Sequence, residues 1–351
     1  MKYYLKDSFL HNAHEKNAGS KARNDVEAIL ISEGYEGLEL KVENWYKMNF
    51  FKAQQHKYRA TKSVFDQLGA GDELVIQFPI IHHTFFISQL IKQAQKRGVK
   101  FYLLIHDIET LRHAAGSEVK FRHKVRNYFQ EKKALMSVDG IIVHNDIMKK
   151  VLADQGVPAG KMVSLEIFDY LIPNFDEKTA PQKDQPIIVA GNLNPTKSGY
   201  LYNLPERPAY NLYGVGYDES RALKNIAYFG SFMPDDLPVA LEGSFGLVCD
   251  GYSSETWQGS YGNYLRFNNS HKASLYLASG FPVVVWKESA LAHFILEKSC
   301  GIAVASLHDL EAVLENLTEK EYADLSENAK RIGKDLREGY YLRSALKKLN
   351  D

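Results

Sequence analysis

The stretch NNSHKASLYLASGFPVVVW, residues 268–286, decides the fold of this chain. Its first half is typical of a helix that begins near Ser270, because serine is a favoured N-terminal cap. Gly280 is typical of a helix C-terminus. The residues FPVVVW then have the continuous apolar character of a strand that is buried on both faces. A helix followed at once by a buried strand indicates a parallel α/β sheet.

The same alternation continues through the rest of the chain. It predicts twelve strands, at 2–8, 37–42, 73–79, 100–107, 140–145 and 162–168, and then at 186–191, 210–216, 225–230, 244–250, 281–286 and 301–306. The expected helices span 20–34, 50–68, 84–97, 119–136 and 145–155, and then 235–242, 270–279, 288–298, 307–316 and 319–349. The sequence therefore predicts an α/β protein with two tandem Rossmann-like, doubly wound domains.

A charged segment with three prolines, IPNFDEKTAPQKDQP, separates the two sets of strands and is typical of a linker. We expect an N-terminal domain over 1–171, a linker over 172–185 and a C-terminal domain over 186–330. Residues 331–351 are expected to form a C-terminal helix that packs back on the first domain. Because ligands bind at the carboxyl ends of the strands in open α/β sheets, we expect the two domains to face a cleft.

The composition is that of a globular protein, with 45% hydrophobic and 25% charged residues. No apolar run approaches the roughly 18 residues that a membrane span needs, and the N-terminus lacks the apolar core of a signal peptide. The two cysteines, Cys249 and Cys300, lie in apolar surroundings, which favours a reducing compartment. We therefore expect a cytoplasmic protein, with a position at the inner face of the cell membrane left open.

The net charge is zero, but residues 1–165 carry 25 Lys and Arg against 18 Asp and Glu, so the remainder is acidic. An anionic partner for the first half and mutual attraction of the halves both remain open. The basic, aromatic segment 120–133 predicts either a solvated helix face or peripheral contact with anionic lipid. No nucleic-acid-binding signature accompanies it, so we expect no nucleic-acid partner. A homo-oligomer is neither indicated nor excluded.

Several catalytic and cofactor motifs are absent from the sequence. It has no P-loop, no Gly-x-Ser-x-Gly elbow, and neither the His and Cys spacings of a metal site nor an Asp-x-Asp pair, so we expect no metal and no cofactor. Four polar residues instead lie at the carboxyl ends of predicted strands, where ligands bind. These candidate catalytic residues are His82, His83, His106 and Asp107, and the alternative is that they are polar residues with structural partners.

An anion site is the strongest functional prediction. Lys272 falls in the first turn of the helix that begins near Ser270, where the helix dipole disfavours a cation unless an anion is bound. A hydroxyl, an ammonium group and free backbone N–H groups together suit a diphosphate. His271 either contacts this ligand or packs. The loop after 186–191 supplies a second set of candidates, Gly191, Asn192 and Lys197.

Three further residues, Gly214, Gly216 and Tyr217, form a glycine-rich turn after a predicted strand. The turn lacks the third glycine of a dinucleotide-binding fingerprint. A close approach of its backbone to a ligand and a plain tight turn both remain open.

Three of these segments together resemble a known family. FGLVCD followed by NNSHKASLYLASGFPVVVW, over 244–286, combines with IHD at 105–107 and GN at 191–192. The pattern resembles GT-B-fold bacterial glycosyltransferases. It is most similar to the group that includes the streptococcal nucleotide-sugar glucosyltransferase of serine-rich adhesin glycosylation and the β-1,6-galactofuranosyltransferase-like proteins.

The resemblance implies roles for the candidate residues. The second domain would bind a UDP-sugar, with Lys272 neutralising the diphosphate, Lys197 assisting, and residues 214–217 near the base and ribose. The first domain would bind the acceptor, and its loop with Gly19 and Ser20 would approach the donor sugar. The resemblance also implies that neither a metal nor another cofactor is needed.

The sequence therefore predicts a metal-independent hexosyltransferase. It would move a galactofuranosyl or glucosyl unit from a UDP-sugar to a glycan, a lipid-linked saccharide or a glycoprotein. Asp107 and His106 are the first candidates for a general base, followed by His82 or His83. Two alternatives remain: a non-catalytic glycosyltransferase-like subunit or sugar-binding module, and a nucleotide-sugar epimerase.

Overall fold

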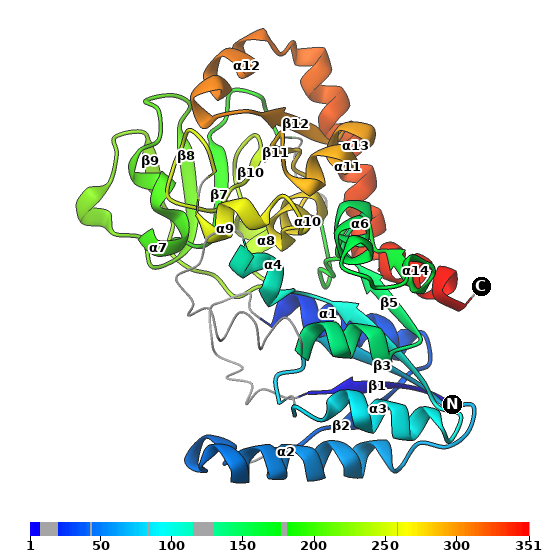
Figure 1. Ribbon diagram of the computed structural model, residues 1–351. Coiled ribbons are helices and arrows are strands. Elements are labelled where there is room, and N and C mark those ends of the chain that lie inside the picture. The colour runs from blue at the N-terminus through cyan, green and yellow to red at the C-terminus, as the bar shows by residue number, and fades with distance from the viewer. Residues whose placement is uncertain are drawn as a thin grey trace.

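The fold is described from a computed structural model, in which residues 1–7, 20–42, 44–82, 84–114, 130–176, 181–257 and 259–350 are placed. These residues form two six-stranded sheets in which every strand pairing is parallel (Figure 1). The strands of the first sheet are β1 (Lys2–Lys6), β2 (Glu36–Glu39), β3 (Glu73–Phe78), β4 (Lys100–Ile105), β5 (Gly140–Val143) and β6 (Met162–Ser164). Those of the second are β7 (Ile187–Asn192), β8 (Tyr210–Val215), β9 (Ile226–Tyr228), β10 (Gly246–Val248), β11 (Val283–Trp286) and β12 (Gly301–Val304).

Helices connect these strands and pack beside both sheets (Figure 1). With the first sheet lie α1 (Lys21–Ser32), α2 (Phe50–Phe65), α3 (Ile87–Gln95), α4 (Glu109–Ala114) and α6 (Asp146–Asp154), and residues 130–137 are also helical. With the second lie α7 (Pro195–Ser198), α8 (Leu237–Ala240), α9 (Ser260–Tyr264), α10 (His271–Ala278), α11 (Ala290–Glu297), α12 (Leu310–Asn316) and α13 (Glu319–Arg337). The last helix, α14 (Tyr340–Asn350), packs against the first sheet.

The predicted α/β fold with two doubly wound domains is confirmed, and all twelve predicted strands are present. The short helices α4, α7 and α9 were not predicted, because four to six residues are too few to show a helical period. Most of the predicted helix 119–136, and with it most of the basic segment 120–133, lies outside the described residues. Gly280 has φ +88°, the left-handed conformation of a glycine that ends a helix, as expected after α10.

Strand order places a topological switch point in each sheet. The first sheet runs β2-β1-β3-β4-β5-β6, so the chain leaves β1 on one side for β2 and returns on the other as β3. The second sheet runs β12-β11-β10-β7-β8-β9, with the equivalent reversal between β7 and β10. In such sheets the crevice beyond the carboxyl ends at the switch point binds ligands.

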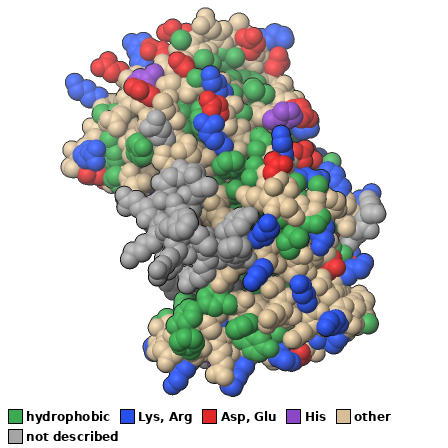
Figure 2. Space-filling model, in the orientation of Figure 1, with side chains coloured by type: hydrophobic (Ala, Val, Ile, Leu, Met, Phe, Trp, Pro, Cys, Tyr) green, Lys and Arg blue, Asp and Glu red, His purple; other side chains and the backbone are tan. Residues whose placement is uncertain are grey.

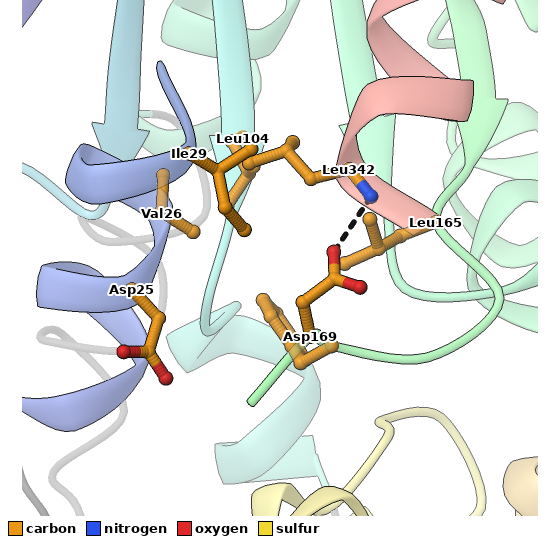
Figure 3. A pocket seen from close by; sticks show the side chains of 8 residues that line it. Asp25, Val26, Ile29, Leu104, Leu165, Asp169 and Leu342 are labelled. Atoms are coloured by element: carbon orange, nitrogen blue, oxygen red, sulfur yellow. Dashed lines mark hydrogen bonds between the residues drawn. The ribbon is translucent and has the colours of Figure 1, made fainter. Parts of the chain in front are cut away.

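The C-terminal helix joins the two halves of the molecule. Helix α13 packs on α10 of the second half, whereas α14 contacts β5, β6 and α1 of the first (Figure 1). Asp169 lies in the segment that follows β6, and its carboxylate accepts hydrogen bonds from the backbone N–H groups of Tyr341 and Leu342 (3.1 and 2.7 Å) at the start of α14 (Figure 3). The carboxylate thus occupies the positive end of that helix. The domain boundaries themselves stay predictions.

Two buried carboxyl groups meet at this junction. Asp25 of α1 and Asp169 line a small cavity of about 10 Å³ (Figure 3). Burial raises the pKa of Asp25 to about 6 and that of Asp169 to about 7. Lys21 bridges the two halves, because its Nζ lies 2.8 Å from Asp25 Oδ1, 2.7 Å from Leu171 O and 2.9 Å from Asp235 Oδ1.

Candidate active site

A cavity of about 690 Å³ lies between the two sheets, at the carboxyl ends of their strands. Its walls hold nine of the predicted site residues: His106, Asp107, Gly191, Asn192, Lys197, Gly214, Ser270, His271 and Lys272. Residues that are far apart in the sequence are therefore brought to one cleft, with the two candidates for a general base facing it from the first half and the candidate anion site from the second.

Helix α10 presents its N-terminus to this cleft. Ser270 is the N-cap residue with extended backbone angles (φ −71°, ψ 128°), but its hydroxyl makes no capping hydrogen bond. The predicted side-chain cap is therefore wrong, and the hydroxyl, which lines the cavity, is not committed to its own helix. The first backbone N–H groups of α10 keep the partial positive charge that favours an anion.

Neighbouring groups hold the Lys272 side chain in place. Its Nζ donates to the carbonyl oxygen of Cys249 (2.6 Å) and to Asp250 Oδ1 (3.0 Å), and the two charged side chains are each 12% exposed. Asp250 follows β10, so the pair ties the first turn of α10 to the neighbouring strand end. This arrangement fixes the position of the ammonium group at the edge of the cavity.

Lys197 supplies a second cation from α7, the short helix that follows β7. Its Nζ lies 5.7 Å from the centre of the Tyr261 ring, and its carbonyl oxygen accepts a hydrogen bond from Gly251 N–H (2.7 Å). No ion pair between Lys197 and a carboxylate is found in the part of the chain that the structure describes. Its charge is therefore the more available of the two for an anionic ligand.

The glycines of the second half have structural reasons of their own. Gly191 and Gly214 are paired in β7 and β8 with φ +122° and +151°, and a Cβ on Gly214 would lie 1.8 Å from Gly191 O. A Cβ on Gly191 would lie 3.5 Å from Lys272 Cε. The pair thus allows two backbones to approach each other closely, and Gly191 leaves room for the Lys272 side chain.

On the opposite wall, His106 is a half-buried side chain with a neutral ring. Its Nε2 lies 2.7 Å from Gln77 Oε1, and its ring stacks on Phe168 with centroids 5.3 Å apart. Burial, together with the nearby charge of Arg23, holds the pKa of His106 well below its usual range. His106 is therefore a weak base at neutral pH.

Asp107 is the more accessible candidate, with its side chain 35% exposed. Its Oδ1 forms an ion pair with Arg112 (2.6 Å), and Arg112 also donates to Glu109 Oε1 (2.9 Å). Burial alone would lower the pKa of the Arg112 guanidinium. The two carboxylates, Asp107 and Glu109, have the larger combined effect, so the pKa is raised. Arg112 thus holds in place the Asp107 carboxylate, which lines the cleft.

The second half of the chain also supports the loop that follows β4. The hydroxyl of buried Tyr264 accepts a hydrogen bond from the Ile108 N–H (3.0 Å), and the guanidinium of Arg112 lies 5.3 Å from the Tyr264 ring. Because Tyr264 ends α9 and Ile108 follows Asp107, the contact couples the two walls of the cleft.

Asn269 couples the walls at a second place. Its Nδ2 donates to the carbonyl oxygens of His144 and Glu166 (2.8 and 2.7 Å), and its Oδ1 accepts from Asn145 Nδ2 (2.7 Å). Its backbone N–H donates to His144 Nδ1 (2.9 Å), and burial lowers the pKa of His144 to about 4, consistent with a neutral ring. Asn269 immediately precedes Ser270, so the first half of the chain positions the N-terminus of α10.

His271 packs between aromatic rings rather than standing free. Its ring lies 5.0 Å from that of Tyr170 and 6.2 Å from that of Phe168. Burial lowers the pKa of His271 to about 4, against a smaller opposing effect of a hydrogen bond with the Asp169 backbone. Its Nε2 is buried without a hydrogen-bond partner among the described residues, although the residue lines the cleft.

The cleft carries an excess of positive charge. Arg23 lines it from α1, where its Nη2 donates to the Pro79 carbonyl oxygen (2.7 Å). With Arg112, Lys197 and Lys272 it makes four cations, against the two carboxylates Asp107 and Asp250 that also line the cavity. A formal charge of plus two among these lining side chains favours a dianionic ligand.

Of the remaining predicted residues, those that the structure describes do not line this cleft. His82 Nδ1 lies 2.5 Å from Asp7 Oδ1, and Asp7 also accepts the backbone N–H of Ile81, so His82 has a structural partner at the carboxyl ends of β1 and β3. Ser20 is the residue before α1 and is exposed.

Gly216 and Tyr217 belong to a turn beside the cleft. Gly216 turns against Asn194, and Tyr217 stacks on Tyr202 with centroids 5.7 Å apart. Because the Tyr217 ring packs on another ring, its arrangement fits a plain tight turn better than a ligand contact. His83 and Gly19 lie outside the described residues.

Sequence analysis missed five residues that shape the cleft: Arg23, Arg112, Asp250, Tyr264 and Asn269. Asp250 could have been found, because it is the last residue of the predicted strand 244–250 and so lies at a carboxyl end. Arg23, Arg112 and Tyr264 lie within or beside helices, and their contacts depend on the packing of the two halves, which no local pattern encodes.

Within the described ranges, no group of three or more His, Cys, Asp or Glu side chains is placed to hold a metal ion. Across the same ranges, no helix has the length and apolar character that crossing a bilayer requires. Cys249 and Cys300 are both buried free thiols, as expected.

Comparison with known proteins identifies the family. Residues 2–167 match the model described as glucosyltransferase 3-like, N-terminal domain, and residues 187–349 match glucosyltransferase 3-like, C-terminal domain. The chain is 32% identical over 357 residues to beta-1,6-galactofuranosyltransferase WbbI of Escherichia coli (strain K12), over 99% of this chain and 98% of that protein. It belongs to the glucosyltransferase 3-like family. The predicted family resemblance is thereby confirmed.

A second relative of this family is glucosyltransferase 3 of Streptococcus gordonii, which is 25% identical over 328 residues, covering 93% of this chain and 92% of that protein. Both relatives are named as hexosyltransferases, and this chain is accordingly a glycosyltransferase of that kind. This finding favours an enzyme over the non-catalytic subunit and over the epimerase.

Solved structures confirm the GT-B fold. Sucrose-phosphate synthase from Thermosynechococcus elongatus superposes with a TM-score of 0.66 at 13% identity, over 98% of this chain and 96% of that chain. The lipopolysaccharide outer core galactosyltransferase WaaB superposes with a TM-score of 0.59 at 10% identity, over 99% of each chain. Anabaena HepE in complex with UDP gives a TM-score of 0.56 at 12% identity, over 96% of this chain and 97% of that chain.

Proposed function

We propose that the chain transfers a glucosyl or galactofuranosyl unit from a UDP-sugar to a saccharide acceptor, without a metal ion. The two hexoses are those named for its two relatives. The acceptor would be a glycan, a lipid-linked saccharide or a glycoprotein. The observation that carries the proposal is the cleft itself, where two lysines and the N-terminus of α10 face Asp107 and His106.

The donor side of the cleft suits a diphosphate. Transfer breaks the anomeric C–O bond and leaves negative charge on the nucleotide diphosphate, which fixed cations and backbone N–H groups stabilise. Lys197, Lys272 and the α10 N-terminus line one wall of the cavity. The excess charge of plus two among the lining groups balances the two negative charges of a diphosphate diester. These groups would do the work that a divalent cation does in other transferases.

The acceptor side offers a base. An inverting reaction needs a group that takes the proton of the acceptor hydroxyl. We assign this role to Asp107 rather than His106, because Asp107 is 35% exposed in the cleft whereas burial makes His106 a weak base. Arg112 would hold the carboxylate in place.

Incubation with a panel of UDP-, GDP- and dTDP-sugars tests the proposal. In the presence of EDTA, we expect slow release of UDP from UDP-glucose or UDP-galactofuranose, and faster release when methyl glycosides are added as acceptors. Release from none of the UDP-sugars, or release only after Mg²⁺ is restored, would contradict it.

A further inference from the structure

An exposed aromatic cluster lies at the end of the first domain, away from the second. The N-terminus of α2 carries Phe50 and Phe51, which are 53% and 83% exposed and whose rings lie 5.6 Å apart. Tyr46, in the 3₁₀ turn η1 (Trp45–Lys47) just before α2, is 62% exposed, and Phe86, just before α3, is 46% exposed. Two large aromatic side chains as exposed and as close together as Phe50 and Phe51 are unusual on a protein surface that contacts only water.

The segments of sequence that carry this cluster are basic. Residues 44–65 and 84–100 contain nine Lys and Arg and neither Asp nor Glu. Lys47 and Lys52, which flank Phe50 and Phe51 in the sequence, are exposed, and neither is ion-paired with a carboxylate in the described part of the chain. We call Tyr46, Lys47, Phe50, Phe51, Lys52 and Phe86 the aromatic–basic patch. Figure 2 shows hydrophobic side chains surrounded by Lys and Arg at this lower end of the molecule.

We propose that the aromatic–basic patch docks the protein on the surface of an anionic lipid bilayer. Aromatic rings partition into the interfacial layer of a bilayer, and lysines next to them are attracted by anionic head groups. The two features together are those of a surface that lies on a membrane without spanning it. The proposal rests on this surface alone and does not depend on the proposed reaction.

Charge argues against a second copy of the chain as the occupant. A two-fold interface brings the same patch of two subunits together. Lys47 and Lys52 would then face their own copies with no carboxylate of the patch to pair with them, and such like-charge contacts are unfavourable. An anionic surface complements both features of the patch.

Co-sedimentation with vesicles tests the proposal. The probes are vesicles of phosphatidylcholine alone and of phosphatidylcholine with phosphatidylglycerol in a two-to-one mixture. We expect the whole chain to sediment with the second kind and not with the first. Phe50→Ser with Phe51→Ser should lower the partition coefficient more than tenfold, and Lys47→Gln with Lys52→Gln about thirtyfold.

Control variants remove exposed apolar and basic side chains that lie outside the patch. Val239→Ser deletes an apolar residue that is 69% exposed on the second domain. Lys320→Gln with Lys334→Gln deletes two lysines that are 87% and 70% exposed on α13. Both controls should bind vesicles as the unaltered chain does.

Three results would overturn the proposal. The first is that the unaltered chain does not bind the mixed vesicles. The second is that the patch variants bind these vesicles as well as the controls do. The third is that, in solution without lipid, the variant Phe50→Ser with Phe51→Ser has a lower molecular mass than the unaltered chain. The last result would assign the patch to an interface between copies of the chain. Since the altered side chains are exposed, an unchanged unfolding temperature will show that the variants are folded.

Discussion

Lys272 Nζ lies 3.0 Å from Asp250 Oδ1, so the cation at the N-terminus of α10 has a carboxylate partner at the end of β10. Both side chains are 12% exposed, and removal of one charge would leave the other with poor solvation. The lysine thus has a structural role in addition to its proposed role in binding a diphosphate. A single substitution at this position tests both roles at once, and a pair of substitutions separates them.

Lys272→Ala should lower the free energy of unfolding by roughly 3 kcal/mol, because Asp250 loses its partner. It should also abolish the rise in unfolding temperature that UDP produces in the unaltered chain. The double variant Lys272→Met with Asp250→Leu removes both charges, so we expect much of the stability to return while UDP still has no effect. Recovery of the UDP effect in the double variant would show that Lys272 does not bind the nucleotide.

Lys197→Ala should weaken UDP binding about tenfold with little loss of stability, because this lysine contacts the Tyr261 ring and its loss exposes no buried charge. Calorimetric titration with UDP measures the change. Lys224→Ala, at an exposed lysine of the second domain that does not line the cleft, is the control. Equal affinities for the Lys197 variant and this control would remove Lys197 from the site.

Asp107→Asn should reduce sugar transfer by a factor of about 10² to 10⁴ if the carboxylate is the general base. UDP affinity should stay within about threefold, because the altered group lies on the acceptor wall. Glu109→Gln removes the other carboxylate that is bonded to Arg112 and should have the smaller effect on transfer. If both variants lose the same activity, the role of Asp107 is to hold Arg112 and not to take a proton.

Asp169→Asn should change how stability depends on pH. Burial raises the pKa of Asp169 to about 7 in the folded chain, from 3.8 for an ordinary aspartate. Between these values the folded state binds more protons than the unfolded state, so this group makes the protein less stable as the pH rises from about 4 to about 7. Urea unfolding across that range should show the loss in the unaltered chain relative to the variant. If the free energies of unfolding of the two proteins change in parallel with pH, the pKa of Asp169 is not raised.

Much of the fold was predictable because it depends on short-range patterns. Most strands of both sheets are largely apolar runs, such as FPVVVW after the helix at 271–278, and the helices between them have an amphipathic period. The rule that ligands bind at carboxyl strand ends then brought His106, Asp107, Gly191 and Lys197 into one candidate site, and all four line the cleft.

The details of the site were less predictable because they depend on packing between the halves. Nothing near Asp250 in the sequence indicates that Lys272 is its partner, since 22 residues separate them. His82 is a second example: its position after a strand predicted a catalytic role, and nothing near it in the sequence indicates that Asp7 from the adjacent strand end is the partner of its ring. Strand order, which decides such neighbours, is a property of the whole sheet.

Calorimetric titration of the whole chain with UDP in the presence of EDTA is the most direct test of the proposed anion site. We predict binding at a single site, weakened more than tenfold in a variant that combines Lys197→Ala with Lys272→Met and Asp250→Leu. Binding that appears only when Mg²⁺ is added, or that is unchanged in this variant, would contradict the account.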